Sequence, residues 1–274
     1  MNQHKSSILF ITMISLFISM NAGQRKKAII IGATSGMGRA TAKLLAKKYD
    51  VGLVGRRTHL LKSLQDEIET TSYIKTLDVA APEEAQEKLS ELILEMGGLD
   101  LILISISGYF DNLSNENVST WEKHKTTIDI DFKGFIAMAD VAFTFFKNQG
   151  HGHLVGVSSI SGIRGDANCP VYCAAKAGIS TFLDAIRNYT KQKNLKNIYI
   201  TDIIPGWVNV GIVDYTKQPE TYWVTPLEKA AKQIYEGIEN KKNNIYISKR
   251  QILIAWMLKL LPDYLYNKPW WTIR

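Results

Sequence analysis

A tyrosine and a lysine in the middle of the chain stand at a spacing that supports proton transfer. Tyr172 and Lys176 are four residues apart, and on a helix such a pair projects from one face, close enough to interact. An ammonium beside a phenol favours the phenolate, so we expect Lys176 to lower the pKa of Tyr172 from about 10 toward neutrality. Tyr172 is then the candidate general acid for a ketone, or the general base for an alcohol.

A serine upstream completes this constellation. Ser159 lies thirteen residues before Tyr172, directly after the apolar run 153–158. That run is typical of a buried strand, which would deliver the hydroxyl to the C-terminal edge of a parallel sheet, where open α/β sheets bind ligands. We expect Ser159 to hold the substrate oxygen by hydrogen bonding. The tyrosine-lysine pair alone is weak evidence, because many helices carry such a pair as a solvated contact.

A glycine-rich segment near the start has the composition of a phosphate-binding turn. Gly32, Gly36 and Gly38 follow the β-branched run 27–31 and precede 39–46, a strong helix former. A strand, a glycine turn and a helix N-terminus offer a pyrophosphate close backbone approach, N–H donors and the positive end of a helix dipole. The spacing Gly-x3-Gly-x-Gly differs from the commoner dinucleotide fingerprint, and a purely structural turn is the alternative. The flanking strand and helix favour a dinucleotide site.

Short apolar runs alternate with amphipathic stretches along most of the chain. With 274 residues, 46% of them hydrophobic, the chain is long enough for one α/β domain with a continuous core. The alternation predicts a single doubly wound domain of the Rossmann type, with a central parallel sheet flanked by helices. We place this domain at 26–248, after an apolar extension at 1–25 and before an apolar, aromatic segment at 249–274. The strands are expected near 27–31, 51–54, 73–77, 100–106, 153–158, 198–203 and 244–247.

From about Lys26 to Ser248 the chain resembles the short-chain dehydrogenases/reductases, which carry these motifs in the same order. The resemblance implies a nicotinamide-dependent oxidoreductase that interconverts a carbonyl and an alcohol. It implies that Ser159, Tyr172 and Lys176 are catalytic and that Lys176 also contacts the nicotinamide ribose. Cofactor contacts are implied for the glycine turn, the pair that meets the adenine ring, the loop after the fourth strand and the turn beside the nicotinamide: Gly32, Thr34, Ser35, Gly36, Met37, Gly38, Asp78, Val79, Ser107, Gly108, Tyr172, Lys176, Pro205, Gly206 and Val208.

Three positions depart from the family's pattern. Ser105-Ile106-Ser107-Gly108 replaces Asn-Asn-Ala-Gly, so side-chain amides that brace the neighbouring strand are missing. Asp131 stands where the family has a helix asparagine that holds a water of the proton relay. A carboxylate can hold that water too, so we count Asp131 as catalytic, and its charge would perturb Lys176. Val210 replaces a threonine that binds the carboxamide.

The end of the second expected strand bears on the choice of cofactor. A site for NAD has an acidic residue there for the ribose 2′-hydroxyl, whereas an arginine accommodates the 2′-phosphate of NADP. This chain has Gly55 followed by Arg56 and Arg57, and guanidinium groups bind phosphate bidentately. We predict NADP(H), with Arg56 the first candidate for the phosphate and Arg57 the second. A solvated basic pair at the start of a helix is the alternative.

Charge and cysteine content restrict the function classes further. The formal net charge is +7, but the basic residues are spread and lack interleaved aromatics, so we predict no nucleic-acid partner. Attraction of an anionic cofactor or of anionic lipid headgroups explains the charge better. The two cysteines, Cys169 and Cys173, are too few for a metal site or a disulfide framework. We predict no metal and two reduced packing residues.

Both ends of the chain are open to several interpretations. The apolar run 8–20 after Lys5 fits a membrane anchor, a cleaved secretory signal, or an extension absent from a protein that starts at Met20. The apolar and aromatic segment 251–271 could lie in a membrane interface, cap the substrate pocket or pack on a partner subunit. We predict a cytoplasmic protein, with membrane association through either end as the alternative.

Two functions remain in competition at this stage. The first is an NADPH-dependent reductase of a lipophilic ketone or aldehyde, because Tyr215, Tyr222 and Trp223 lie in the segment 207–226 that corresponds to the family's substrate lid. The second is a catalytically weakened NADP(H)-binding scaffold or sensor at a membrane. The resemblance also implies a homodimer or homotetramer that pairs through the helices beginning near Asp131 and Pro170.

Overall fold

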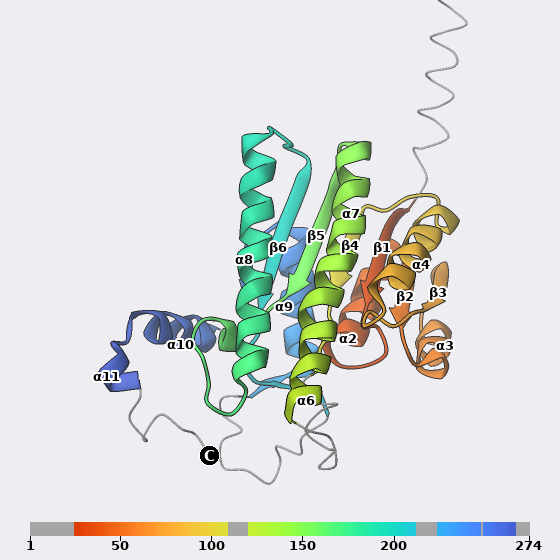
Figure 1. The fold of residues 1–274 in the computed structure, drawn as a ribbon. Coiled ribbons are helices and arrows are strands. Elements are labelled where there is room, and N and C mark those ends of the chain that lie inside the picture. Colours follow the sequence, from red (N-terminus) through yellow and green to blue (C-terminus); the bar gives the residue numbers. More distant parts are fainter. Residues whose placement is uncertain (1–24, 109–119, 212–223, 248, 267–274) are drawn as a thin grey trace, which may run out of the picture.

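A parallel sheet of seven strands forms the centre of the molecule, with helices on both faces (Figure 1). The computed structural model describes residues 25–108, 120–211, 224–247 and 249–266. The strand order is β3-β2-β1-β4-β5-β6-β9, so the predicted fold class is confirmed. The strands are β1 (Lys26–Ile31), β2 (Tyr49–Gly55), β3 (Ser72–Thr76), β4 (Leu101–Ile104), β5 (Gly152–Val157), β6 (Ile198–Ile204) and β9 (Asn244–Tyr246).

The strand order reverses between β1 and β4, because the chain leaves β3 at one edge and returns on the other side of β1. Open α/β sheets bind their ligands at such a switch point, outside the carboxyl ends of the strands. The glycine turn after β1 and the loop after β4 therefore lie side by side at the predicted site.

The helices form two layers. One layer consists of α2 (Gly36–Leu45), α3 (Thr58–Asp66) and α9 (Leu227–Glu239), which pack against one face of the sheet. The other layer contains α4 (Pro82–Glu95), α7 (Phe135–Gln149) and α8 (Pro170–Gln192). The helix α6 (Thr120–Thr127) leads into α7 through a short π-helical segment, η1 (Ile128–Gly134).

The strand β1 shows how the sequence builds the two-sided core. Its residues Ala28 to Ile31 are all fully buried, as expected for a central strand of a parallel sheet, which reads as a continuous apolar run. Ile29 and Ile31 pack on the α4, α7 and α8 side, whereas Ala28 and Ile30 pack on the opposite side. Successive side chains of a strand point to opposite faces, so one run of apolar residues serves both cores.

Short elements outside the sheet were not predicted. Two-residue strands, β7 (Val208–Asn209) and β8 (Thr225–Pro226), pair in parallel with each other, and a 3-10 turn, η2 (Ile160–Gly162), follows β5. Elements of two or three residues are too short to leave a periodic pattern in the sequence.

The C-terminal helices α10 (Lys249–Leu260) and α11 (Asp263–Tyr266) contact the domain through several side chains, among them Arg164 and Tyr266, whose hydroxyl donates a 2.6 Å hydrogen bond to the Gly165 carbonyl. Arg164 follows η2 and donates a 3.2 Å hydrogen bond to the Leu258 carbonyl. Its guanidinium also hydrogen-bonds the Leu261 carbonyl, pairs with Asp263 and lies 4.2 Å from the centre of the Tyr266 ring. The C-terminal helices therefore dock on the loop that follows η2.

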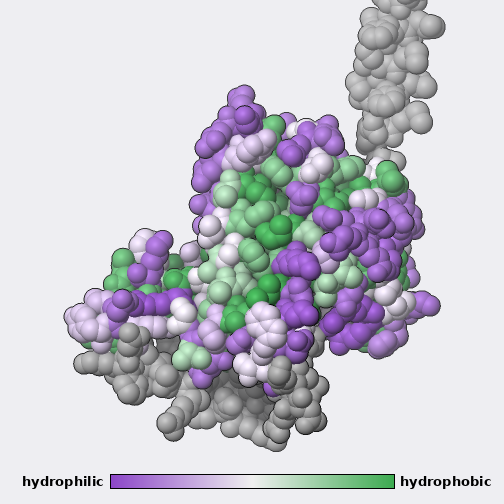
Figure 2. Space-filling model, viewed as in Figure 1, coloured by the Kyte–Doolittle hydropathy of each residue, from purple (hydrophilic) through white to green (hydrophobic). Residues whose placement is uncertain are grey.

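Much of the apolar surface of these two helices stays exposed. Leu253, Trp256, Leu260 and Tyr264 each expose more than half of their surface. Green residues are visible on the left side of Figure 2, in the region where Figure 1 places α10. Of the helices in the described ranges, none combines the length and the apolarity that a membrane crossing requires. Residues 1–24 of the expected N-terminal extension 1–25, the aromatic residues Tyr215, Tyr222 and Trp223, and the segment 267–274 lie outside the described residues.

Candidate active site

Ser159 stands just beyond the end of β5, at the carboxyl edge of the sheet. It is buried and caps η2, since its Oγ accepts a 3.1 Å hydrogen bond from the Ser161 N–H. The Ser159 side chain also hydrogen-bonds the Tyr172 hydroxyl. The hydroxyl is thus fixed at the edge where the sequence predicted it.

Tyr172 and Lys176 lie on the first two turns of α8. The Lys176 Nζ lies 5.5 Å from the centre of the Tyr172 ring and donates hydrogen bonds of 3.1 and 3.3 Å to the carbonyls of Ile106 and Val157. These carbonyls follow β4 and end β5, so the ammonium joins α8 to two neighbouring strand ends.

Close packing of η2 on α8 brings the serine to the other two side chains. A Cβ at Gly162 would lie 2.7 Å from the Ala177 nitrogen and 2.8 Å from the Lys176 carbonyl carbon. Only glycine permits an approach of this kind. Ser159 at the start of η2 is therefore held next to Tyr172 and Lys176 on α8.

The expected lowering of the Tyr172 pKa is wrong for this arrangement. Burial raises the pKa of Tyr172, the Asp131 carboxylate raises it further, and the hydrogen bond with Ser159 opposes them. Burial also lowers the pKa of Lys176, against the pull of Asp131 and Asp202. The spacing of two residues on a helix shows that they are neighbours, but it does not show how deeply both are desolvated. Tyr172 consequently keeps its proton at neutral pH, as a proton donor to a carbonyl must.

Asp131 lies in η1 and is fully buried. Its Oδ1 accepts a 2.8 Å hydrogen bond from the Gly108 N–H. This carboxylate, which comes from another element, therefore braces the loop after β4. Short π-helical segments occur frequently at functional sites, and here the segment aims a charged side chain at the loop.

The turn between β1 and α2 needs its glycines for close packing. Gly32 has φ +88°, and a Cβ there would lie 2.0 Å from the Ser105 carbonyl oxygen. A Cβ at Gly38 would lie 2.3 Å from the Gly32 carbonyl oxygen. Gly36 has φ +55° and starts α2, with Val210 next to it. The turn thus presents bare backbone at a helix N-terminus, which suits a pyrophosphate.

Both arginines after β2 lie beside this turn. Arg57 donates hydrogen bonds of 2.9 and 3.1 Å to the hydroxyls of Thr34 and Ser35. The Arg56 Nη1 lies 4.0 Å from an oxygen of Asp78. A Cβ at Gly55 would lie 2.7 Å from the Thr34 methyl group, so any side chain at this position would require the Thr34 side chain to shift.

The other predicted cofactor residues lie along the same edge. Val79 is buried against Gly134, where a Cβ would lie 2.6 Å from the Val79 carbonyl oxygen. The Pro205 carbonyl accepts a 2.9 Å hydrogen bond from Ile160, which links the Pro205-Gly206 turn to η2. Val208 is buried in β7, Met37 packs against the core, and Ser107 is exposed beyond the end of β4.

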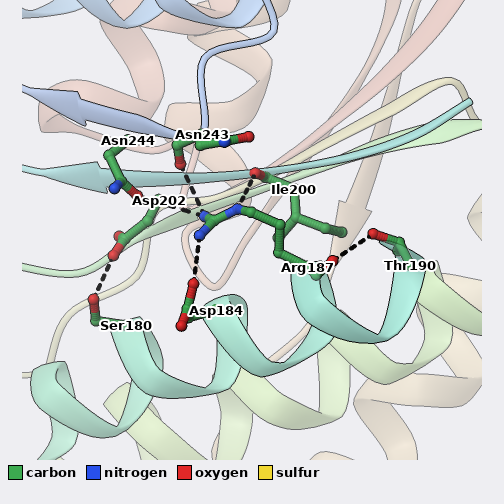
Figure 3. Close-up of polar contacts among 8 residues, drawn as sticks. All are labelled: Ser180, Asp184, Arg187, Thr190, Ile200, Asp202, Asn243 and Asn244. Carbon is green, nitrogen blue, oxygen red and sulfur yellow. Dashed lines mark hydrogen bonds and ion pairs between the residues drawn. The ribbon is translucent and has the colours of Figure 1, made fainter. Parts of the chain in front are cut away.

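A polar network that the sequence did not reveal fixes α8 to the sheet (Figure 3). Ser180 donates a 2.6 Å hydrogen bond to Asp202, which is buried in β6. Arg187 donates to the carbonyls of Ile200 and Asn243 and pairs with Asp184 at 2.9 Å. An acidic residue inside the apolar run 198–204 was the one available signal for this network. The network holds the helix that carries Tyr172 and Lys176.

No group of three metal-ligating side chains comes together in the part of the chain that the structure describes. The groups that the structure gathers at the site are proton donors, backbone amides and cationic side chains. This set fits a dinucleotide, because the bare glycine turn and two guanidinium groups meet the needs of its phosphates.

Curated relatives resemble the chain over most of its length. An uncharacterized oxidoreductase of Myxococcus xanthus is 28% identical over 253 residues, which cover 88% of this chain and 95% of the relative. An uncharacterized oxidoreductase of Staphylococcus epidermidis is 26% identical over 195 residues, covering 70% of this chain and 82% of the relative.

Solved structures share the fold. A short chain dehydrogenase from Burkholderia cenocepacia, in complex with NADP, has a TM-score of 0.71 at 17% identity and covers 81% of this chain and 96% of its own. A 3-oxoacyl-[acyl-carrier protein] reductase from Brucella melitensis, in complex with NAD, has a TM-score of 0.68 at 16% identity, with coverages of 82% and 96%. At these identities the likeness establishes the architecture alone.

A family model gives the assignment. Residues 26–221 match the model described as short chain dehydrogenase, and this range includes the glycine turn, Ser159, Tyr172 and Lys176. The chain belongs to the short chain dehydrogenase family of oxidoreductases.

Proposed function

We propose that the protein is an NADP(H)-dependent oxidoreductase that interconverts a carbonyl and an alcohol on an apolar small molecule. One observation carries the proposal. Ser159, Tyr172 and Lys176 meet at the carboxyl edge of the sheet, the same edge at which the β1–α2 turn presents its glycines. Proton-transfer groups and a dinucleotide turn at one switch point are what hydride transfer requires.

A bound nicotinamide dinucleotide would supply or accept the hydride. Tyr172 would donate its proton to the carbonyl oxygen during reduction, and the raised pKa keeps that proton available at neutral pH. Ser159 would orient the oxygen through its fixed hydroxyl. Lys176 would stabilise the phenolate that remains, since a cation near a phenol favours its charged form.

The preference for NADP(H) rests on the end of β2. Arg57 already hydrogen-bonds the hydroxyls of the glycine turn, which favours it over Arg56 as the residue nearest the phosphates. Arg56 lies toward Asp78 and would close the other side of the 2′-phosphate. Both NADP and NAD appear in the similar structures, so the arginines carry this part of the proposal.

The apolar substrate is supported by the position of the C-terminal helices. Arg164 lies between Ser159 and Tyr172 in the chain and holds α10 and α11. The exposed side chains Trp256 and Tyr264 thus belong to a segment that docks on the loop between two catalytic residues. Aromatic side chains beside a site favour bulky apolar ligands.

We infer a homo-oligomer that pairs through α7 and α8. Partly buried apolar side chains of these helices, among them Ile136, Phe182 and Ile186, lie over the sheet, and a band of green and pale residues covers this face in Figure 2. Size-exclusion chromatography with light scattering should give a dimer or tetramer, and a monomer at micromolar concentration would contradict the inference.

The second candidate is a catalytically weakened NADP(H)-binding scaffold at a membrane surface. The exposed apolar side chains of α10 favour it, because such patches mark interaction sites. It predicts NADPH binding without turnover of any carbonyl, and co-sedimentation with lipid vesicles.

Replacement of the tyrosine separates the two candidates. The full chain and its Tyr172→Phe variant would be assayed for NADPH consumption with a panel of apolar ketones, aldehydes and quinones. We expect the variant to bind NADPH as the parent does and to lose about 10²- to 10⁴-fold in turnover, the range for general acid catalysis. The control Tyr189→Phe, at an exposed position of the same helix, should keep full turnover. Equal activity of Tyr172→Phe and the parent would refute the proposed mechanism.

A further inference from the structure

The only two cysteines of the chain face each other at the start of the catalytic helix. The sulfur atoms of Cys169 and Cys173 lie 3.7 Å apart, and neither is in a disulfide. Tyr172 lies between them in the chain. The mechanism proposed above uses neither thiol, so their arrangement calls for its own explanation.

The surroundings of Cys173 favour its thiolate. The Asp166 N–H donates a 3.2 Å hydrogen bond to the Cys173 sulfur, and the Cys169 thiol is within hydrogen-bonding distance on the other side. These contacts, with the Cys169 hydrogen bond the larger, lower the pKa of Cys173 to about 7. A cysteine near a helix N-terminus with such donors is a better nucleophile at neutral pH than an isolated one.

Cys169 is placed to react with its neighbour. It precedes Pro170 as the N-cap of α8 and has φ -146° and ψ 54°, outside the helical region. The four residues before it, 165–168, are all exposed. A disulfide requires sulfurs about 2.05 Å apart, so the pair must close by somewhat under 2 Å. Cys169 is the N-cap of α8, so the exposed segment before it and the first turn after it share this movement.

We propose that Cys169 and Cys173 form a peroxide-sensitive dithiol that closes to an intramolecular disulfide. The Cys173 thiolate attacks one oxygen of hydrogen peroxide, which breaks the O–O bond, forms the sulfenic acid and releases hydroxide. The proton that Cys173 lost on forming its thiolate neutralises this hydroxide to the first water. The Cys169 sulfur then attacks the Cys173 sulfur and forms the S–S bond, and the sulfenic hydroxyl group leaves with the Cys169 proton as the second water. Overall two thiols are oxidised, one peroxide is reduced, and two waters form.

Closure of the pair would displace the catalytic tyrosine. The Cys173 N–H donates a 3.0 Å hydrogen bond to the Cys169 carbonyl, so the two residues bracket the first turn of α8. Tyr172 is part of that turn. A displacement of about 1 Å in a catalytic group can lower the rate by about 10²-fold. This consequence rests on the proposed function, whereas disulfide formation does not.

Thiol counting and mass measurement test the chemistry independently of activity. The full chain would be treated with hydrogen peroxide at neutral pH and then with iodoacetamide, with and without dithiothreitol. We expect a product lighter by two hydrogen atoms that has no alkylatable thiol, and recovery of both thiols after dithiothreitol. NADPH turnover on any accepted carbonyl should fall by at least about tenfold and return on reduction.

Serine variants assign the roles of the two sulfurs. Serine at position 169 can still donate a hydrogen bond to Cys173, so Cys169→Ser should give a sulfenic acid on Cys173 that dimedone traps, and its basal activity should be unchanged. Cys173→Ser should react with peroxide several-fold more slowly, because its remaining thiol lacks the donors around Cys173.

Two results would overturn the proposal. One is that both thiols of the parent remain alkylatable after peroxide treatment that oxidises free cysteine. The other is that Cys169→Ser and Cys173→Ser react with peroxide at the same rate. If the disulfide forms but the reduced protein shows no NADPH turnover, the proposed oxidoreductase function is refuted, whereas the proposed peroxide-sensitive dithiol is supported.

Discussion

The Gly108 N–H donates a 2.8 Å hydrogen bond to the buried carboxylate of Asp131. Lys176 donates to the Ile106 carbonyl in the same loop, so the loop after β4 is held by an acid on one side and a base on the other. Asp131 also raises the pKa of both Tyr172 and Lys176. One buried carboxylate therefore contributes to the position of the loop and to the charge of two proposed catalytic groups.

Removal of this carboxylate by two substitutions separates its roles. Asp131→Ala leaves the Gly108 N–H without its acceptor, which should lower the free energy of unfolding by about 1–3 kcal/mol. Asp131→Asn keeps an acceptor oxygen and should be nearer the parent in urea denaturation. The negative charge raises the Tyr172 pKa. In Asp131→Asn the rate of alcohol oxidation should therefore begin to increase at a lower pH than in the parent. An unshifted profile in Asp131→Asn would show that its charge does not reach the tyrosine.

The glycine turn gives a matched pair of stability tests. Gly32 and Gly150 both have positive φ, +88° and +82°, but a Cβ at position 32 would meet the Ser105 carbonyl and one at position 150 would meet nothing within 4 Å. Gly150→Ala should therefore cost only the backbone strain, about 1–2 kcal/mol. Gly32→Ala must also move the loop after β4, so it should cost clearly more and abolish dinucleotide binding. Equal unfolding free energies for the two variants would contradict the packing described for the turn.

The sequence predicted the sheet well because each central strand is buried on both faces and leaves a continuous apolar run. The fourth strand was predicted to reach residue 106, but it ends at Ile104, since the carbonyl of Ser105 turns toward Gly32. That limit depends on a contact between residues 73 positions apart. No local pattern contains it.

The buried histidine of β5 predicts a loss of stability in acid. His153 shares a 2.7 Å hydrogen bond with Thr201, and burial lowers its pKa from 6.5 to about 4. The unfolded chain binds a proton between these pH values and the folded one does not, so the free energy of unfolding should fall as the pH drops from 6.5 to 4. The loss amounts to at most about 3 kcal/mol. Between pH 6.5 and 4, the free energy of unfolding of His153→Gln should fall less than that of the parent. The control His151→Gln, at an exposed position, should show the same fall as the parent. The same fall for the parent and for His153→Gln would refute the assignment.

Arg164 should control the docking of the C-terminal helices. Arg164→Ala removes the hydrogen bonds to the carbonyls of Leu258 and Leu261 and the pair with Asp263. We expect chymotrypsin to cleave near the exposed Trp256 and Leu260 several-fold faster, because local opening exposes the backbone. Arg39→Ala, which loses contacts to Leu60 and Glu67, is the control and should keep the parent's cleavage rate in this segment. An unchanged rate in Arg164→Ala would mean that other contacts hold α10 and α11.

The sequence was sufficient to predict which residues form the candidate site, because their types and their order along the chain identify them. Neighbours on one helix, such as Tyr172 and Lys176, follow from spacing, but the direction of the Tyr172 pKa does not, because burial comes from elements distant in the chain. Asp202 and Arg187 were missed for the same reason, since their partners lie on β6, on α8 and beside β9. The sequence placed Arg56 before Arg57 for the phosphate, and our proposal reverses this order because Arg57 hydrogen-bonds Thr34 and Ser35, which lie more than 20 residues earlier in the chain.

The most direct test of the proposed function is a fluorescence titration of the full chain with NADPH and, separately, with NADH. The parent should bind NADPH at least about tenfold more tightly, the effect of roughly 1.4 kcal/mol. Arg57→Ala and Arg56→Ala should each reduce the preference in affinity for NADPH over NADH. The control Lys47→Ala, which removes a positive charge from an exposed position elsewhere, should leave this preference unchanged. Tighter binding of NADPH that depends on the arginines would support the dinucleotide site, and binding of neither nucleotide would contradict the oxidoreductase function.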